Sequence, residues 1–282
     1  TVTGCVINNN SDYGLQNVET VISSVISGNA GTGIRNPRTV VNSRISGNGD
    51  GGIEGGDMTL TNCTITGNYK YSMGSERGAG GVYINSSERN VSLTNCIVWG
   101  NSYDHYYHSF SDLNAAQQGM MIGHDEIFMY DAGDGSGSLT FNHSNIQGSG
   151  GSDAWADDFM GARGFRGTDG GGNIDSDPIF FRASSATSIK SGAHKKGVAT
   201  EEGNFNLVNG SLALDAGDDY APDLTAYNIE NDLNGDSRKQ DSPPEAGNQI
   251  DMGAYEGGDD AKIIFVSSDA TGEGTGVDWQ NA

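Results

Sequence analysis

Hydrophobic and polar residues alternate over short stretches of the chain, and the same alternation returns at nearly equal intervals. In one copy, Leu60 and Ile65 mark an apolar side, while Thr59, Thr61 and Thr66 are expected to face outwards. A period of two is typical of a β-strand, and the three- and four-residue spacing of an amphipathic helix is missing. We therefore predict short strands, each followed by a turn rich in glycine and asparagine.

The copies recur with a period that is typical of a solenoid. The asparagines that close successive copies are Asn10, Asn29, Asn48, Asn68 and Asn101. They are separated by 19, 19, 20 and 33 residues. A repeat of about 20 residues holds two or three strands with their turns, which is one coil of a solenoid. The sequence therefore predicts an all-β fold, a right-handed parallel β-helix followed by a loop-rich C-terminal region.

Stacked coils place equivalent residues above one another in columns. We expect an inward apolar column of Ile7, Ile26, Ile45, Ile65, Val98 and Ile146. Beside it we expect small residues, namely Cys5, Ser24, Ser43, Cys63, Cys96 and Ser144. The five closing asparagines are predicted to form a structural ladder of side-chain amides, in preference to a ligand site. Cys63 and Cys96 could form a disulfide, but free buried thiols fit the column better.

The pattern divides the chain into three parts. Residues 1–149 are predicted to hold the coils, with an insertion at 102–137. Residues 150–258 form the C-terminal region, and 259–282 contain a strand that could open a following β-helix domain. Because the chain begins inside a repeat, we expect it to be a piece of a longer or tandem-repeat protein.

The last apolar stretch is the candidate for assembly. It consists of Ile263, Ile264, Phe265 and Val266. We predict that this strand pairs with a neighbouring copy, in tandem or head to tail, and continues the solenoid. The alternative is that it folds back on its own domain.

The net charge of the chain restricts the classes of partner that we expect it to bind. There are 37 acidic and 15 basic residues, which gives a net charge of −22. Such a surface repels nucleic-acid phosphates and anionic lipids, so we expect neither as a partner. No apolar run approaches the roughly 18 residues of a membrane span. The charge instead suits cation binding and solubility outside the cell.

Aromatic and histidine residues gather in the insertion and just after the last coil. The candidate ligand-binding residues are Tyr103, His105, Tyr106, Tyr107, His108 and Trp155. Aromatic rings with a polar edge could serve as stacking platforms for a glycan. The alternative is a lid that packs its rings on the coils. A zinc site is disfavoured, because no further Cys or His is placed to complete four ligands around His105 and His108.

One turn has the spacing of the first half of a calcium loop. Its oxygen-bearing side chains are those of Asp232, Asn234 and Asp236. An EF-hand is excluded because Pro243 stands where the distal glutamate is required. A looser calcium site that includes Asp251 or Glu256 remains open. The alternative is a polar turn in which Asp232 and Arg238 pair and fix the C-terminal region.

Four motifs in the second half of the chain carry a family resemblance. They are Asn-Ile-Asp-x-Asp-Pro-x-Phe at 173–180, Ser-x-Ala-x-Asp-Ala-Gly-Asp at 211–218, Asp-x-x-Gly-x-x-Arg at 232–238 and Ile-Asp-x-Gly-Ala-Tyr-Glu at 250–256. In this order they resemble the C-terminal part of bacterial right-handed parallel β-helix surface proteins of the polymorphic outer-membrane-protein and choice-of-anchor type. The resemblance covers about residues 1–256. It implies a secreted or cell-surface β-helix, and many such proteins are adhesin-like.

These patterns together favour a structural function. We expect a rigid, acidic, extracellular stalk or fibre subunit with an adhesive role. One alternative is a calcium-assisted polysaccharide lyase or hydrolase, for which Lys70, Arg77, His105 and His108 could supply the charged groups. No catalytic residue is nominated, because 37 acidic residues single out no pair. The other alternative is a non-catalytic carbohydrate-binding module.

Overall fold

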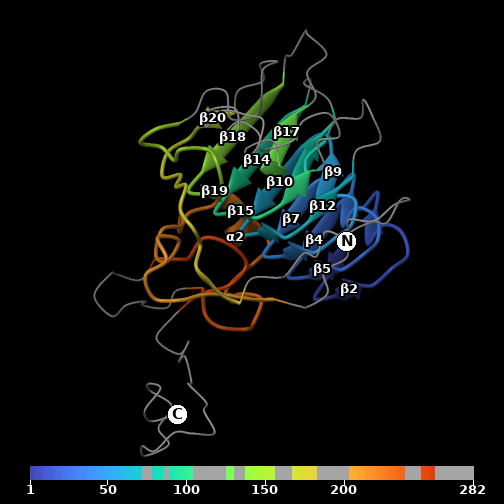
Figure 1. Ribbon diagram of the computed structural model, residues 1–282. Coiled ribbons are helices and arrows are strands. Elements are labelled where there is room, and N and C mark those ends of the chain that lie inside the picture. The colour runs from blue at the N-terminus through green and yellow to red at the C-terminus, as the bar shows by residue number, and fades with distance from the viewer. Residues whose placement is uncertain are drawn as a thin grey trace, which may run out of the picture.

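The computed structural model describes residues 1–71, 78–85, 89–103, 125–129, 137–155, 167–182, 203–238 and 249–257. These residues are all-β apart from short helical segments such as α2 (Pro222–Ala226). Three parallel sheets dominate the fold, and their strands follow one another in layers (Figure 1). The C-terminal region, orange and red in Figure 1, lies along one side of these layers.

The chain visits the three sheets in a fixed rotation. Sheet A contains, in spatial order, β1 (Val2–Thr3), β4 (Thr20–Ile22), β7 (Thr39–Val41), β10 (Met58–Thr61), β14 (Asn90–Thr94), β18 (Ser138–Asn142) and β20 (Thr168–Asp169). Sheet B contains β2 (Val6–Asn8), β5 (Val25–Ser27), β8 (Arg44–Ser46), β11 (Thr64–Thr66), β15 (Ile97–Trp99) and β19 (Asn145–Ile146). Sheet C contains β3 (Leu15–Gln16), β6 (Ile34–Arg35), β9 (Ile53–Gly55), β13 (Val82–Ile84) and β17 (Ile127–Met129). One passage through A, B and C is called a coil below, and this arrangement is consistent with a parallel β-helix.

Two small sheets complete the strands. The parallel pair consists of β12 (Tyr69–Lys70) and β16 (Ser102–Tyr103). The antiparallel pair, in the C-terminal region, consists of β21 (Phe180–Arg182) and β22 (Asn204–Leu207). The second pair forms part of the candidate site described below.

The core consists of stacked columns of apolar side chains that the sheets contribute. In sheet B the predicted column is confirmed, because the residues pair in the order Ile7, Ile26, Ile45, Ile65, Val98 and Ile146. Sheet A contributes Val21, Val40, Leu60, Leu93 and Phe141, all fully buried. Because the same apolar position recurs in every coil, burial of each new coil extends one continuous core.

The small-residue column is confirmed in its register, but Cys5, which was expected to face inwards, is exposed in the first coil. Cys63 and Cys96 are buried free thiols, as the sequence favoured. Two coils before Cys63, the hydroxyl of Ser24 donates to the carbonyl of Ile22 at 2.8 Å. The thiol of Cys63 makes the equivalent contact with the carbonyl of Thr61 at 3.3 Å. Cysteine and serine are therefore interchangeable solutions to one small space at this corner of the coil.

The turns need left-handed backbone at two corners of each coil. At one corner the residue before each ladder asparagine has positive φ, for example Gly47 and Gly67, at 63° and 62°. At the corner between sheets A and B the residue is an asparagine in three coils: Asn42, Asn62 and Asn95 have φ of 50°, 48° and 53°. Glycine and asparagine tolerate this conformation best, which explains their recurrence along the chain.

Two expectations from the sequence are corrected by the structure. Residues 127–129, inside the predicted insertion, form β17 and pair with β13 of sheet C. Three residues are too few to reveal a period of two, so this strand could not be identified from the pattern. Thr61 and Thr66, both expected to face outwards, are 1% and 4% exposed. The C-terminal region covers Thr61. Its hydroxyl donates to Asp223 at 2.7 Å.

Among the described residues, no helix combines the length and the apolar character that crossing a membrane requires.

Candidate functional site

The predicted asparagine ladder is present as a continuous chain of hydrogen bonds. The backbone N–H and the side-chain amide of Asn48 both donate to Oδ1 of Asn68, at 3.0 and 2.9 Å. The same amide also donates to the carbonyl of Ile26 in the preceding coil, at 3.2 Å. The pattern repeats from Asn10 to Asn29, from Asn29 to Asn48 and from Asn68 to Asn101. These side chains are committed to binding coil to coil.

A glutamate that the repeat does not predict ends the ladder. The backbone N–H of Asn101 donates to Oε1 of Glu126 at 3.0 Å, and its side-chain amide donates to Oε2. Glu126 is fully buried. Burial raises the pKa of this carboxyl to about 8, although the hydrogen bonds from Asn101 act in the opposite direction. The ladder therefore ends on a titratable group in the interior.

A second asparagine column, at the corner between sheets A and B, holds the C-terminal region. The side-chain amide of Asn62 donates to the carbonyls of Asp251 and Gly253, each at 3.3 Å. Asn95 donates to the carbonyl of Asp218 at 3.0 Å and accepts from its N–H at 2.7 Å. Asparagine suits this position for two reasons. It tolerates positive φ, and its side-chain amide forms hydrogen bonds with backbone groups of the covering segment.

A buried ion pair joins the C-terminal region to the same column. Arg238 donates to Glu256 at 2.7 Å and to the carbonyl of Gly253 at 3.1 Å. Its second amino group donates to Oδ1 of Asn42. Burial raises the pKa of Glu256 to about 8, and Arg238 opposes this shift. Burial also raises the pKa of Asp251 to about 7.

The predicted calcium turn is held by its own backbone. One carboxylate oxygen of Asp232 accepts from the N–H groups of Asn234 and Asp236, each at 2.8 Å. The other oxygen accepts from the N–H of Glu256 at 2.9 Å. This resembles the alternative of a polar turn, except that Arg238 forms its ion pair with Glu256. In the ranges that the structure describes, no group of three or more His, Cys, Asp or Glu could hold a metal ion. Calcium binding stays a prediction.

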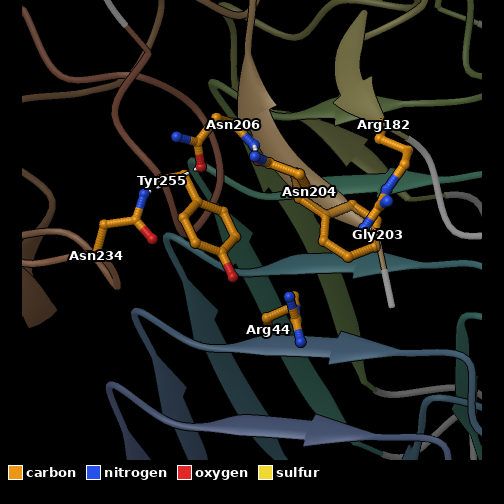
Figure 2. A pocket seen from close by; sticks show the side chains of 8 residues that line it. Arg44, Arg182, Gly203, Asn204, Asn206, Asn234 and Tyr255 are labelled. Atoms are coloured by element: carbon orange, nitrogen blue, oxygen red, sulfur yellow. Dashed lines mark hydrogen bonds between the residues drawn. The ribbon is translucent and has the colours of Figure 1, made fainter. Parts of the chain in front are cut away.

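A cavity of about 340 Å³ opens between the coils and the C-terminal region. Its described lining consists of Arg44, Arg182, Gly203, Asn204, Phe205, Asn206, Asn234 and Tyr255. Figure 2 shows Arg182 and Asn204 on the side of the β21–β22 pair, Arg44 on the strand below, and Tyr255 between Arg44 and Asn234. The side chain of Asn234 donates to Asn206 at 3.0 Å (Figure 2). Arg44 lies 5.1 Å from the ring centre of Phe205, a cation–π contact.

The two predicted ligand-binding residues that the structure describes, Tyr103 and Trp155, are not among the lining residues of this cavity. Tyr103 is half-buried in β16, and its N–H donates to Asp125 at 3.0 Å. Trp155 packs on Phe141 with ring centres 5.4 Å apart, and its indole N–H donates to the carbonyl of Gly167 at 3.1 Å. The other ligand-binding candidates lie outside the described residues, namely His105, Tyr106, Tyr107 and His108. The same is true of Arg77 and of the assembly candidates Ile263, Ile264, Phe265 and Val266. Lys70 is largely buried and pairs with Asp50 at 3.4 Å.

The sequence reasoning missed the cavity, although one signal was available. In sheet B the residues that pair with Arg44 are Val25 and Thr64, and Ile97 follows Thr64 in the same column. An arginine in a column of otherwise uncharged residues departs from the repeat, and such departures often mark functional positions. The asparagines of the lining come from non-repeating segments and carry no comparable signal.

The chain matches no family model, no curated protein and no solved structure.

Proposed function

We propose that the chain is a right-handed parallel β-helix that serves as a rigid, acidic, adhesive scaffold at the cell surface or outside the cell. The observation that carries the proposal is the asparagine ladder, which links five successive coils without interruption from Asn10 to Glu126. A continuous column of hydrogen-bonded amides, buried from Asn29 to Asn101, resists bending and local opening. The net charge of −22 supports solubility outside the cell and disfavours nucleic acid as a partner.

Assembly with neighbouring copies is part of this proposal. Strands β1, β2 and β3 lie at one edge of sheets A, B and C. The backbone of an edge strand can accept a further strand, which is the means by which a solenoid would be extended. The partner would be another β-helix unit, supplied in tandem or by a second molecule.

The first test is electron microscopy of the purified chain at increasing concentration. Rods that join end to end into fibres are the expected result. A matched variant that lacks residues 259–282 should give single short rods, because the predicted pairing strand is removed. Single rods from both chains at every concentration would contradict assembly. Compact, irregular particles would contradict the scaffold itself.

A second test addresses rigidity in solution. Hydrogen exchange should show uniformly slow exchange for the backbone N–H groups of Asn29, Asn48 and Asn68, because each donates to the next coil. Exchange at these amides as fast as at exposed turns would contradict a rigid scaffold.

A second candidate function is carbohydrate binding without catalysis, which is compatible with the scaffold role. The cavity lined by Arg44, Arg182 and three asparagines favours this second function. A polysaccharide-degrading enzyme would be revealed by release of reducing or unsaturated ends from acidic polysaccharides, with and without calcium.

A further inference from the structure

Asparagine is followed directly by glycine at three positions of the chain. The three dipeptides are Asn48-Gly49, Asn209-Gly210 and Asn234-Gly235. In such a dipeptide the backbone nitrogen of glycine can attack the side-chain carbonyl carbon of asparagine, because glycine has no Cβ to crowd the approach. The attack needs an asparagine side chain that can turn and a glycine N–H group that is not already hydrogen-bonded. The fold places the three copies in three different environments.

The first copy lies in the ladder, where both of its residues are held by hydrogen bonds. Asn48 is fully buried, and its side-chain amide donates to the carbonyl of Ile26 and to Oδ1 of Asn68. The N–H of Gly49 donates to the carbonyl of Asn29 at 2.8 Å. The two reacting groups can therefore meet only if the coil opens.

The copy at Asn234-Gly235 is exposed but is also held. The side-chain amide of Asn234 donates to Asn206 at 3.0 Å. The N–H of Gly235 donates to the carbonyl of Asp232 at 3.3 Å. The carboxyl group of Asp232 lies in the same turn, where negative charge disfavours loss of the glycine amide proton. Attack by the glycine nitrogen is hindered on both counts.

The copy at Asn209-Gly210 has neither restraint. Both residues are exposed and occupy the centre of a turn, which the N–H of Ser211 closes by donating to the carbonyl of Val208 at 3.1 Å. Within the described part of the chain, neither the side chain of Asn209 nor the N–H of Gly210 forms a hydrogen bond. Gly210 has a φ of 98°, and no atom lies within 4 Å of the place that a Cβ would occupy. The two reacting groups are therefore free to meet and are open to water.

We propose that Asn209 is a site of spontaneous deamidation in the folded chain. The nitrogen of Gly210 forms a bond to Cγ of Asn209, the Cγ–Nδ2 bond breaks, and the side-chain nitrogen leaves as ammonia with the amide proton of Gly210. Water then opens the five-membered succinimide ring at either of its carbonyl carbons, which gives aspartate or isoaspartate. The net reaction consumes one water, releases one ammonia and adds one negative charge to the chain.

The modified turn belongs to a segment by which the C-terminal region packs on the coils. It joins Leu207 to Ala213, and both are buried in one cluster with Met252 and with Ile97 of β15. Isoaspartate adds one carbon to the main chain between these two anchors. The inference goes beyond the scaffold function and does not depend on it, because local chemistry defines the site.

The test is peptide mapping by mass spectrometry after the full chain is incubated at mildly alkaline pH in water enriched in heavy oxygen. Each deamidation replaces the amide nitrogen with an oxygen from water, so the label identifies events that occur during the incubation. We expect Asn209 to convert at least tenfold faster than Asn48 or Asn234 in the folded chain. Equal rates at the three positions, or faster conversion at either of the other two, would overturn the proposal.

The chain unfolded in guanidinium chloride is the matched control. The three dipeptides then lose their folded environments, so their rates should agree within about threefold. A tenfold preference for Asn209 that persists after unfolding would overturn the structural argument, because the neighbouring residues would then set the rate. The proposal is also overturned if folded Asn209 keeps its amide over a period in which the unfolded chain converts. Asn209→Ser should abolish the labelled product in this turn and leave the urea midpoint unchanged, because the residue is exposed.

Discussion

The coils and the C-terminal region are held together by different chemistry. In the coils, an uncharged asparagine amide and an aliphatic side chain recur at the same positions of each coil, as Asn48 and Ile45 illustrate. In the C-terminal region, contacts that occur only once involve charged side chains. The ion pair of Arg238 with Glu256 is one of them and is almost completely buried. A repeat allows a neutral arrangement to be copied, whereas an irregular segment must satisfy each buried polar group separately. The two regions should therefore fail differently when they are perturbed.

The largest effect is expected from breaking the buried ion pair. Arg238→Met leaves the carboxyl group of Glu256 buried without its cation. Above pH 8, where this group is ionised, the loss should approach the cost of a broken buried pair, about 3–5 kcal/mol. The C-terminal region should detach while the coils remain folded. Limited proteolysis should then cut within 203–257, and the far-ultraviolet circular dichroism of the sheets should persist.

A compensating variant tests the cause of that effect. Arg238→Met combined with Glu256→Leu should recover much of the lost stability, because no unpaired charge remains. Cooperative loss of the coils in the single variant would contradict the separation of the two regions.

A smaller but wider effect is expected from interrupting the ladder. Asn68→Ala removes the acceptor of both donors of Asn48, and each buried unsatisfied group costs about 1–3 kcal/mol. Urea unfolding should show a loss of about 2–4 kcal/mol in the stability of the coils. The matched control is Asn10→Ala in the exposed first coil, which should cost less than about 1 kcal/mol. Equal losses in the two variants would show that the ladder is not a cooperative element.

The pH dependence of the free energy of unfolding should report on Glu126, the group at the end of the ladder. The pKa of Glu126 is about 8 in the folded chain, against 4.5 as its ordinary value. Between these values the unfolded chain binds fewer protons than the folded chain, so stability falls as pH rises from about 4.5 to 8. Each pKa unit corresponds to about 1.4 kcal/mol, which makes the total loss on the order of a few kcal/mol.

Urea midpoints at pH 5 and pH 8.5 would measure this loss. Asp251 and Glu256 contribute in the same direction, since burial raises the pKa of both. Glu126→Gln should therefore flatten the profile only in part. A midpoint that rises with pH in the parent chain would show that Glu126 is charged in the fold throughout this range.

The smallest effect is expected within the small-residue column. Cys63→Ser places at this corner the residue that Ser24 and Ser43 already provide in the preceding coils. The hydroxyl can donate to the carbonyl of Thr61 as the thiol does, so stability should change by less than about 1 kcal/mol. A loss above about 2 kcal/mol would show that the coils are less interchangeable than their register indicates.

The sequence was sufficient to predict the parts of the fold that repeat. Ile65 and Asn68 could be assigned because equivalent residues stand one coil before and after each of them. The contact of Arg238 with Asn42 joins residues 196 positions apart and occurs once, so no pattern could indicate it. The same holds for Glu126, which enters the ladder from within an insertion. The cavity lies where the repeating and non-repeating parts meet. Of its described lining residues, only Arg44 on β8 could be noticed in the sequence, because it departs from the repeat.

The hydrogen bonds between successive ladder amides all run in one direction. Each ladder asparagine donates from its side chain to the Oδ1 of the next one, and only its second contact, with a backbone carbonyl, points back to the preceding coil. The carboxyl group of Glu126 accepts from Asn101 and has no N–H group to donate further, so the series of amides ends at Glu126. Coils could thus be gained or lost upstream of this terminator during evolution without any change to it. The length of the rod and the design of its end are independently adjustable.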